Sequence, residues 1–131
     1  MNLFDVTSDL FTYLTTFRLR VESGIQTTRE EVQKDLLEIF REQEAKVRRN
    51  PVLTSSYNHV KYPLVVFSDE VILNSNWEYV SDWEAELLER RFFESEVGGD
   101  RFFELCEQLE IGNPDVVSIF YTCLAMGFRG R

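Results

Sequence analysis

The sequence predicts an all-α fold, a compact bundle of about six helices formed by a single domain over residues 1–131. Three observations support this prediction. The chain has only 3 prolines and 6 glycines, too few for the many turns of an all-β fold. Its apolar residues recur at steps of three and four, as on one face of a helix. With 44% hydrophobic residues among 131, the chain is also long enough to bury a core.

The N-terminal part predicts two amphipathic helices, over residues 3–22 and 28–49. Apolar residues of the first fall on one helical face, and Gly24 marks its end. The second helix begins at Thr28, which matches a capping box with Glu31. The remaining face of this second helix alternates in charge, which is typical of a solvent-exposed side.

The segment from about 56 to 74 is the candidate central helix, and residues 62–77 form the most apolar stretch of the chain. Residues 62–67 have the composition of a buried strand. Helical spacing nevertheless continues through them from Tyr57 to Val71, and no second strand is evident to pair with them. The sequence therefore favours a helix, with a kink or a start near Pro63. Because it is apolar on nearly every side, we expect this helix to be central and the most buried.

The remainder of the chain predicts three more helices, at about 82–96, 100–110 and 114–126. Ser81 and Glu84 match a second capping box at the start of the first of them. Gly98 and Gly99 are expected to form the turn that ends it, and Asp100 to cap the helix that follows. The last helix opens with an asparagine and a proline, a common pair at a helix start.

The net charge of −9 is concentrated in the second half of the chain. Residues 62–131 contain 14 acidic and five basic side chains, so a phosphate backbone would be repelled and nucleic acid is excluded as a partner. The two cysteines fall on apolar helical positions and are predicted to be reduced, buried thiols rather than a disulfide. No cofactor motif, metal-ligand spacing, signal peptide or bilayer-spanning apolar run is found, so the sequence predicts a soluble chain without metal or cofactor.

Asp69 and Glu70 are the main candidate functional residues, because two carboxylates lie in the most buried predicted helix. Burying a carboxylate costs several kcal/mol unless it is hydrogen-bonded or paired. Three interpretations stay open. Asp69 could accept hydrogen bonds from backbone or indole N–H groups near residues 76–83, and so join the central helix to the next one. The pair could instead belong to an acidic groove that binds a partner, or to a catalytic or metal site.

The order of motifs around this pair resembles the DotU/TssL (IcmH-like) family of type VI and type IVb secretion systems. Four motifs carry the resemblance, each weak alone but together specific in order and spacing: Asp69-Glu70; Trp77 and Trp83 with Leu87-Leu88 and Phe92; Glu96-x-Gly98-Gly99-x-x-Phe102-Phe103; and Ile119-x-Tyr121-x-x-Leu124-Ala125-x-Gly127-Phe128-x-Gly130-Arg131. The resemblance is strong over residues 60–131.

The resemblance implies a hook-like helical domain of two packed sub-bundles at the cytoplasmic face of the bacterial inner membrane. It implies a non-enzymatic scaffold that docks the contractile tail. Its implied partners are an IcmF/TssM-like membrane protein, TssK-like and TssE-like baseplate components, and a second copy of the chain. In this interpretation Asp69 and Glu70 line or shape a cleft, and Trp77 and Trp83 fix its wall. The remaining motif residues are expected to form structural turns, namely Gly98, Gly99, Gly127 and Gly130.

The sequence departs from the family pattern at three places. Bulkier residues at 65–68 precede the carboxylate pair, and Glu78 follows Trp77 where glycine is frequent. The family also continues into further helices and a transmembrane anchor, which implies a truncated C-terminus or an unusually short member. The alternatives are a soluble acidic adaptor or binding module, a type IVb secretion homologue, and a carboxylate-metal enzyme.

Overall fold

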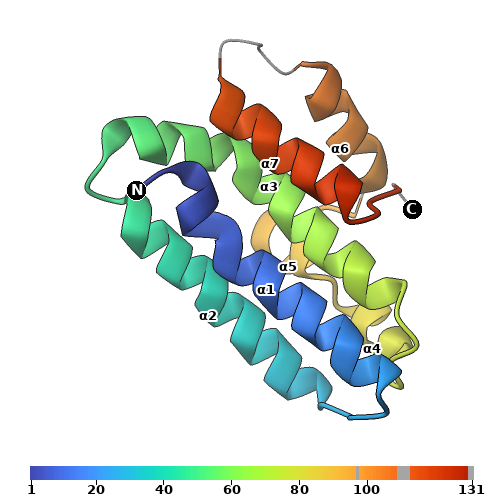
Figure 1. Ribbon diagram of the computed structural model, residues 1–131. Coiled ribbons are helices and arrows are strands. Elements are labelled where there is room, and N and C mark those ends of the chain that lie inside the picture. Colours follow the sequence, from blue (N-terminus) through green and yellow to red (C-terminus); the bar gives the residue numbers. More distant parts are fainter. Residues whose placement is uncertain (97, 109–112, 130–131) are drawn as a thin grey trace.

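The computed structural model describes residues 1–96, 98–108 and 113–129, and it confirms the all-α prediction. The described residues form these helices (Figure 1): α1 (Leu3–Glu22), α2 (Arg29–Val47), α3 (Pro51–Leu73), α4 (Val80–Ala85), α5 (Leu88–Phe93), α6 (Gly98–Glu107) and α7 (Pro114–Ala125). No strand occurs in the described part of the chain, so the strand alternative for residues 62–67 is wrong.

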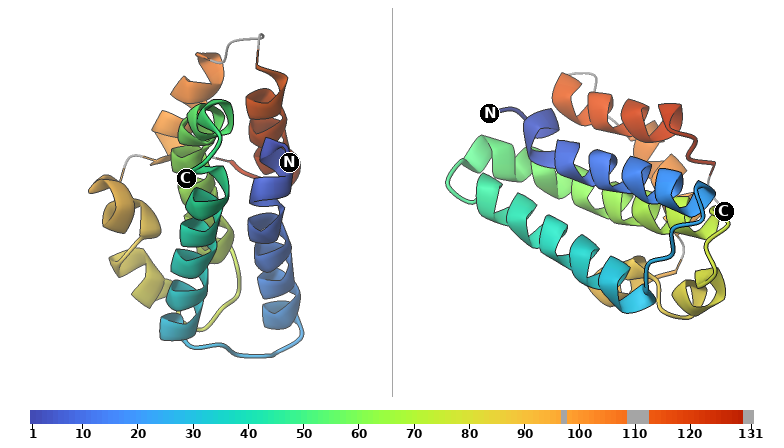
Figure 2. Two further views of the ribbon diagram at one scale, coloured as in Figure 1. Left: turned by 90° about the vertical axis from the view of Figure 1, so that its left-hand side faces the viewer. Right: turned by 60° about the horizontal axis from the view of Figure 1, so that its bottom comes forward.

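Helices α1 and α2 form an antiparallel pair at one side of the molecule (Figures 1 and 2). Asn2 and Asp5 form a reciprocal capping box that begins α1. Thr28 begins α2 by accepting a hydrogen bond from the Glu31 backbone N–H. Gly24 has a φ of +80° just after α1, a conformation that glycine adopts without steric cost.

Helix α3 is the central element and packs against each of the other six helices, with α1 and α7 to one side and α5 to the other (Figure 2). It begins earlier than the sequence predicts, because Asn50 caps it and Pro51 occupies its first turn. The helix continues through Pro63, and residues 63–72 are all buried. Its apolar surface on every side is therefore matched by neighbours on every side.

The predicted helix over 82–96 is instead two short helices, α4 and α5, separated by Glu86 and Leu87. The backbone of Leu87 is extended, at φ −64° and ψ 148°, so the helical hydrogen-bond pattern stops there. The capping box predicted at Ser81 is also wrong, because α4 begins after Tyr79 and has no side-chain cap. The break results from contacts with α3 that are described below, and a local sequence pattern does not encode them.

The C-terminal helices α6 and α7 attach to α3 through a cluster of aromatic rings. Phe102 of α6 stacks on Phe128 at 3.9 Å between ring centroids, and Phe128 also approaches Phe67 of α3 at 6.5 Å. Both cysteines are free, with Cys123 buried and Cys106 half-buried. Among the helices described, none is long and apolar enough to cross a membrane.

Candidate functional site: a buried carboxylate node beside a small cleft

Asp69 lies near the end of α3 and is 4% exposed. Its Oδ1 accepts hydrogen bonds from the indole Nε1 of Trp83 and from the backbone N–H of Leu88, both at 2.9 Å. Its Oδ2 accepts a third bond, from the backbone N–H of Glu89 at 2.9 Å. The Trp83 indole is a donor of the first interpretation made from the sequence, but both backbone donors lie beyond the predicted residues 76–83. One side chain of α3 thereby holds both α4 and α5.

The hydrogen bonds of Asp69 also explain where α5 begins. The first N–H groups of a helix have no partner inside the helix, and a carboxylate in front of them is favourable. Leu87 precedes α5 and offers no side-chain cap. Asp69 fills this role from a different helix, because its carboxylate accepts from the first two amides of α5.

The electrostatics of Asp69 reflect two opposing effects. Burial raises the pKa of its carboxyl group to about 6, from an ordinary value of 3.8. The hydrogen bonds from Glu89, Leu88 and Trp83 act in the opposite direction, and the Glu89 carboxylate raises the pKa slightly further. At neutral pH Asp69 is therefore ionised, and its three donors are matched to a charged acceptor.

Glu70 is also buried and joins α3 to the segment that follows α7. Its Oε2 accepts a hydrogen bond from the backbone N–H of Arg129 at 2.8 Å. A second link fixes the same end of α7, because the Arg18 guanidinium of α1 donates to the Met126 carbonyl at 3.1 Å. Gly127, between these two contacts, has a φ of +105° and lies in the turn after α7.

Glu89 is a third buried carboxylate, and the sequence reasoning missed it. Its Oε2 accepts from the Tyr62 hydroxyl at 2.6 Å and its Oε1 accepts from the Gly98 backbone N–H at 3.1 Å. It therefore connects α3, α5 and the start of α6. The sequence gives one positional signal, since Glu89 directly follows Leu87-Leu88 inside the stretch that carries the family resemblance.

Gly98 is needed for close packing rather than for the predicted turn. The structure places Gly98 and Gly99 in the first turn of α6, which corrects the expectation that they end the preceding helix. A Cβ atom on Gly98 would lie 2.6 Å from the Glu89 Oε1 and 2.7 Å from both methyl groups of Val66. Only a residue without a side chain lets α6 approach Glu89 this closely.

The two tryptophans are buried side by side, with ring centroids 6.0 Å apart. Trp77 donates from its Nε1 to the Thr27 carbonyl at 2.9 Å, and so joins the α3–α4 connection to the α1–α2 loop. Trp83 acts through Asp69. Neither ring lines the cleft, so their place is behind it rather than on its wall.

The cleft itself is small, with a volume of about 70 Å³. It brings together Asp69, Glu70, Gly98 and Gly99, and its other carboxylates are Glu89 and Glu96. Asp69, Glu70 and Glu89 are buried and hydrogen-bonded, so Glu96 is the cleft acid that reaches the surface at the rim. The predicted turn residue Gly130 lies outside the described residues. In the described ranges, no three His, Cys, Asp or Glu residues are placed to hold a metal ion.

Comparisons with known proteins identify the fold and the family of this chain. A structure search found the cytoplasmic domain of TssL from Acinetobacter baumannii, with a TM-score of 0.84 and 21% sequence identity. That match covers 100% of this chain and 84% of the other, and it shows a shared fold. A search of curated protein sequences gave no match. The family model described as "Type VI secretion system protein DotU" matches residues 2–131. Because that match spans nearly the whole chain, the protein belongs to the DotU family of type VI secretion system proteins.

Proposed function

We propose that this protein is a non-enzymatic scaffold that docks baseplate and tail components to the inner membrane in a type VI secretion system. The observation that carries the proposal is the family match over residues 2–131, because that family consists of structural secretion components. The proposed partners are an IcmF/TssM-like membrane protein and TssK-like and TssE-like baseplate components. Docking takes place at the cytoplasmic face of the membrane.

The three buried carboxylates, Asp69, Glu70 and Glu89, form a node that supports this role by making one face of the molecule rigid. Asp69 fixes α4 and α5, Glu89 fixes the start of α6, and Glu70 fixes the segment after α7. A surface held in one conformation loses little conformational entropy when a partner binds. Asp69 and Glu70 are thus positioning residues, and their effect on binding passes through the shape of the cleft.

The surface charge near the cleft supplies the attraction. Residues 62–131 carry 14 acids against five bases, and Glu96 presents its carboxylate at the cleft rim. A partner with a basic docking surface would be steered to this face, and partners of the same sign would be rejected. Glu96 is the acid best suited to a direct contact, because the other three cleft acids are buried and hydrogen-bonded. Glu96 is exposed, and its pairing with Arg90 at 3.3 Å is a surface ion pair that contributes little.

The test measures binding of the purified chain to each of the three proposed partners from the same bacterium by biolayer interferometry. Glu96→Lys reverses the charge at the rim, and we expect it to weaken binding of at least one partner by about tenfold. Glu42→Lys, an exposed change on α2, is the matched control and should bind as wild type does. Both variants should melt at the wild-type temperature.

Two results would count against the proposal. If the wild-type chain binds none of the three partners, the scaffold function is wrong and the acidic adaptor replaces it. If it binds but Glu96→Lys and Glu42→Lys behave alike, the scaffold function stands and the cleft is not its docking site.

A further inference from the structure

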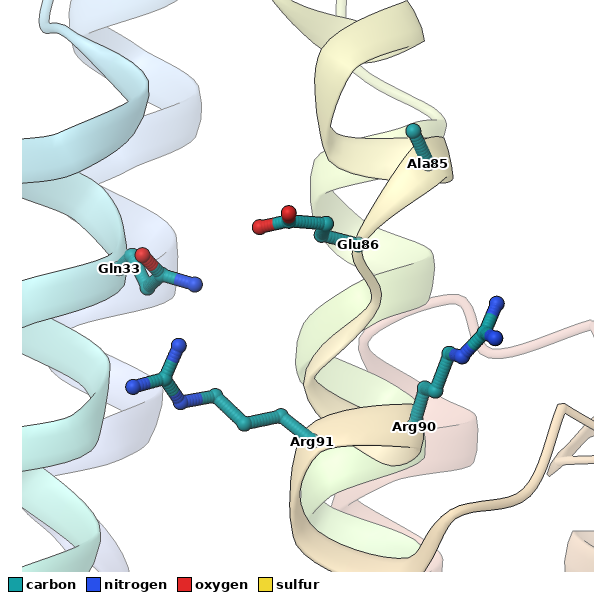
Figure 3. A pocket seen from close by; sticks show the side chains of 5 residues that line it. All are labelled: Gln33, Ala85, Glu86, Arg90 and Arg91. Carbon is teal, nitrogen blue, oxygen red and sulfur yellow. The ribbon is translucent and has the colours of Figure 1, made fainter.

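A second pocket, of about 440 Å³, lies between α2 and the α4–α5 connection (Figure 3). Its lining residues are Gln33, Ala85, Glu86, Arg90 and Arg91, none of which lines the acidic cleft. One of its lining residues, Glu86, lies in the break between α4 and α5. Asp69 holds Trp83 of α4 and the first two amides of α5, and so positions two of the helices that line this second site.

The charges in the pocket leave one guanidinium available. Glu86 forms an ion pair with Arg29 of α2, which neutralises the acid that lines the pocket. Arg90 pairs with Glu96 at 3.3 Å and points away from α2 in Figure 3. Arg91 extends toward α2, where Gln33 lines the same pocket. Arg91 is exposed, and within the described ranges it forms no ion pair.

A guanidinium beside an amide is suited to a carboxylate. Arg91 can donate two parallel hydrogen bonds to the two oxygens of one carboxylate, and the Gln33 amide can donate another. The surroundings limit the ligand to a small negative charge. The chain carries −9 overall, so a polyanion such as nucleic acid would be repelled by the acids around the pocket. A single acidic side chain can make the same contacts with Arg91 and Gln33, and the acidic residues of the chain repel it much less than they repel a polyanion.

We propose that this pocket binds an aspartate or glutamate side chain of a partner protein, with Arg91 as the main recognition group and Gln33 as the second donor. It is a docking site of opposite charge to the acidic cleft. A partner that carries basic residues and one acidic side chain at matching places would contact both, and could bind in one orientation only. The proposal does not depend on the scaffold function, since any acidic partner would test it.

The probe is a blocked peptide that carries one glutamate among neutral residues, titrated into the ¹⁵N-labelled chain and followed by NMR. We expect the amides of Gln33 and of residues 85–91 to shift, and the binding to weaken as salt is added. Arg91→Gln should lower the affinity for the peptide by about tenfold, the loss expected for one charge-assisted hydrogen-bond pair. Arg91→Lys keeps the charge but not the bidentate geometry, and should fall between wild type and Arg91→Gln.

The matched control is Arg48→Gln, which removes the same charge from the far end of α2, about 22 Å from Gln33 along the helix. It should bind the peptide within about twofold of wild type. Because Arg91 and Arg48 are both exposed, both variants should keep the wild-type melting temperature. The proposal is overturned if Arg91→Gln and Arg48→Gln lower the affinity for the peptide equally. It is overturned as well if the peptide changes the NMR chemical shift of no amide in the pocket. It is also overturned if inorganic phosphate or a short single-stranded DNA binds the same residues more tightly than the peptide does.

Discussion

The Asp69 carboxylate of α3 accepts a hydrogen bond from the Leu88 backbone N–H at 2.9 Å, and α5 begins at that residue. One side chain in a central helix thus ends the helical pattern of a segment almost twenty residues away in sequence. The break between α4 and α5 lies directly before this contact, at Glu86 and Leu87.

Removing the Asp69 carboxylate should destabilise the fold strongly. Asp69→Ala leaves the Trp83 indole and the two amides of α5 buried without an acceptor, each at a cost of about 1–3 kcal/mol. We expect the free energy of unfolding in urea to fall by at least about 3 kcal/mol, and partner binding to fall with it. Glu42→Ala, which removes an exposed carboxylate, should change stability by less than about 0.5 kcal/mol. Wild-type melting and binding in Asp69→Ala would refute the role of the node.

The raised pKa of Asp69 should make its contribution to stability depend on pH. The pKa is about 6 in the folded chain and near 3.8 in the unfolded chain, so the folded state holds the proton more tightly. This contribution is fully present below pH 3.8 and is lost as the pH rises to about 6. The wild-type free energy of unfolding, measured relative to Asp69→Asn, should therefore fall by about 2 kcal/mol between pH 4 and pH 7. A difference that grows with pH would mean that the hydrogen bonds outweigh burial.

Gly98→Ala should be costly because its Cβ meets Glu89 and Val66 at under 3 Å. We expect a loss of about 1–3 kcal/mol, the usual cost of overpacking a filled core. Arg101→Ala, an exposed change in the same helix, should cost less than about 0.5 kcal/mol.

A double variant separates this clash from other effects of the alanine. Val66→Ala makes room beside Gly98, so Gly98→Ala should cost less in that background than in the wild type. Urea unfolding of the four chains gives the coupling energy. If the free-energy costs of Gly98→Ala and Val66→Ala simply add, the close approach of Gly98 to Val66 is contradicted.

The Tyr62 hydroxyl should matter more than the Tyr13 hydroxyl, although each donates to one carboxylate. Tyr62→Phe leaves the Glu89 Oε2 without its donor in a buried site, at an expected cost of about 2 kcal/mol. Tyr13 donates at 2.9 Å to Asp35, whose side chain is only half-buried, so Tyr13→Phe should cost less than about 1 kcal/mol. Thermal melts of both variants, fitted with one heat-capacity change, make the comparison. Equal losses would argue against a special role for Glu89.

The fold could be predicted from the sequence because helical spacing is a local signal that covers most of the chain. Asp69 could be selected for a related reason, since a carboxylate in an apolar helix requires a partner. Glu89 and the break before α5 were missed because their causes are tertiary contacts. The hydrogen bonds between α3 and α5 join residues 19 and 20 positions apart, and no pattern within the segment 82–96 encodes them. The second pocket was missed likewise, because Gln33 and Arg91 meet only in the folded chain.

The buried carboxylates accept mostly from the main chain, at Leu88, Glu89, Gly98 and Arg129. Every residue except proline offers the same backbone N–H. At Arg129, where the side chain is exposed, evolution can therefore replace the residue freely without disturbing Glu70. Methods that detect contacts from correlated substitutions would see no signal for such a bond, although it helps to hold the molecule together. For the bond between Glu70 and Arg129, the acceptor would be invariant while the exposed donor residue drifts.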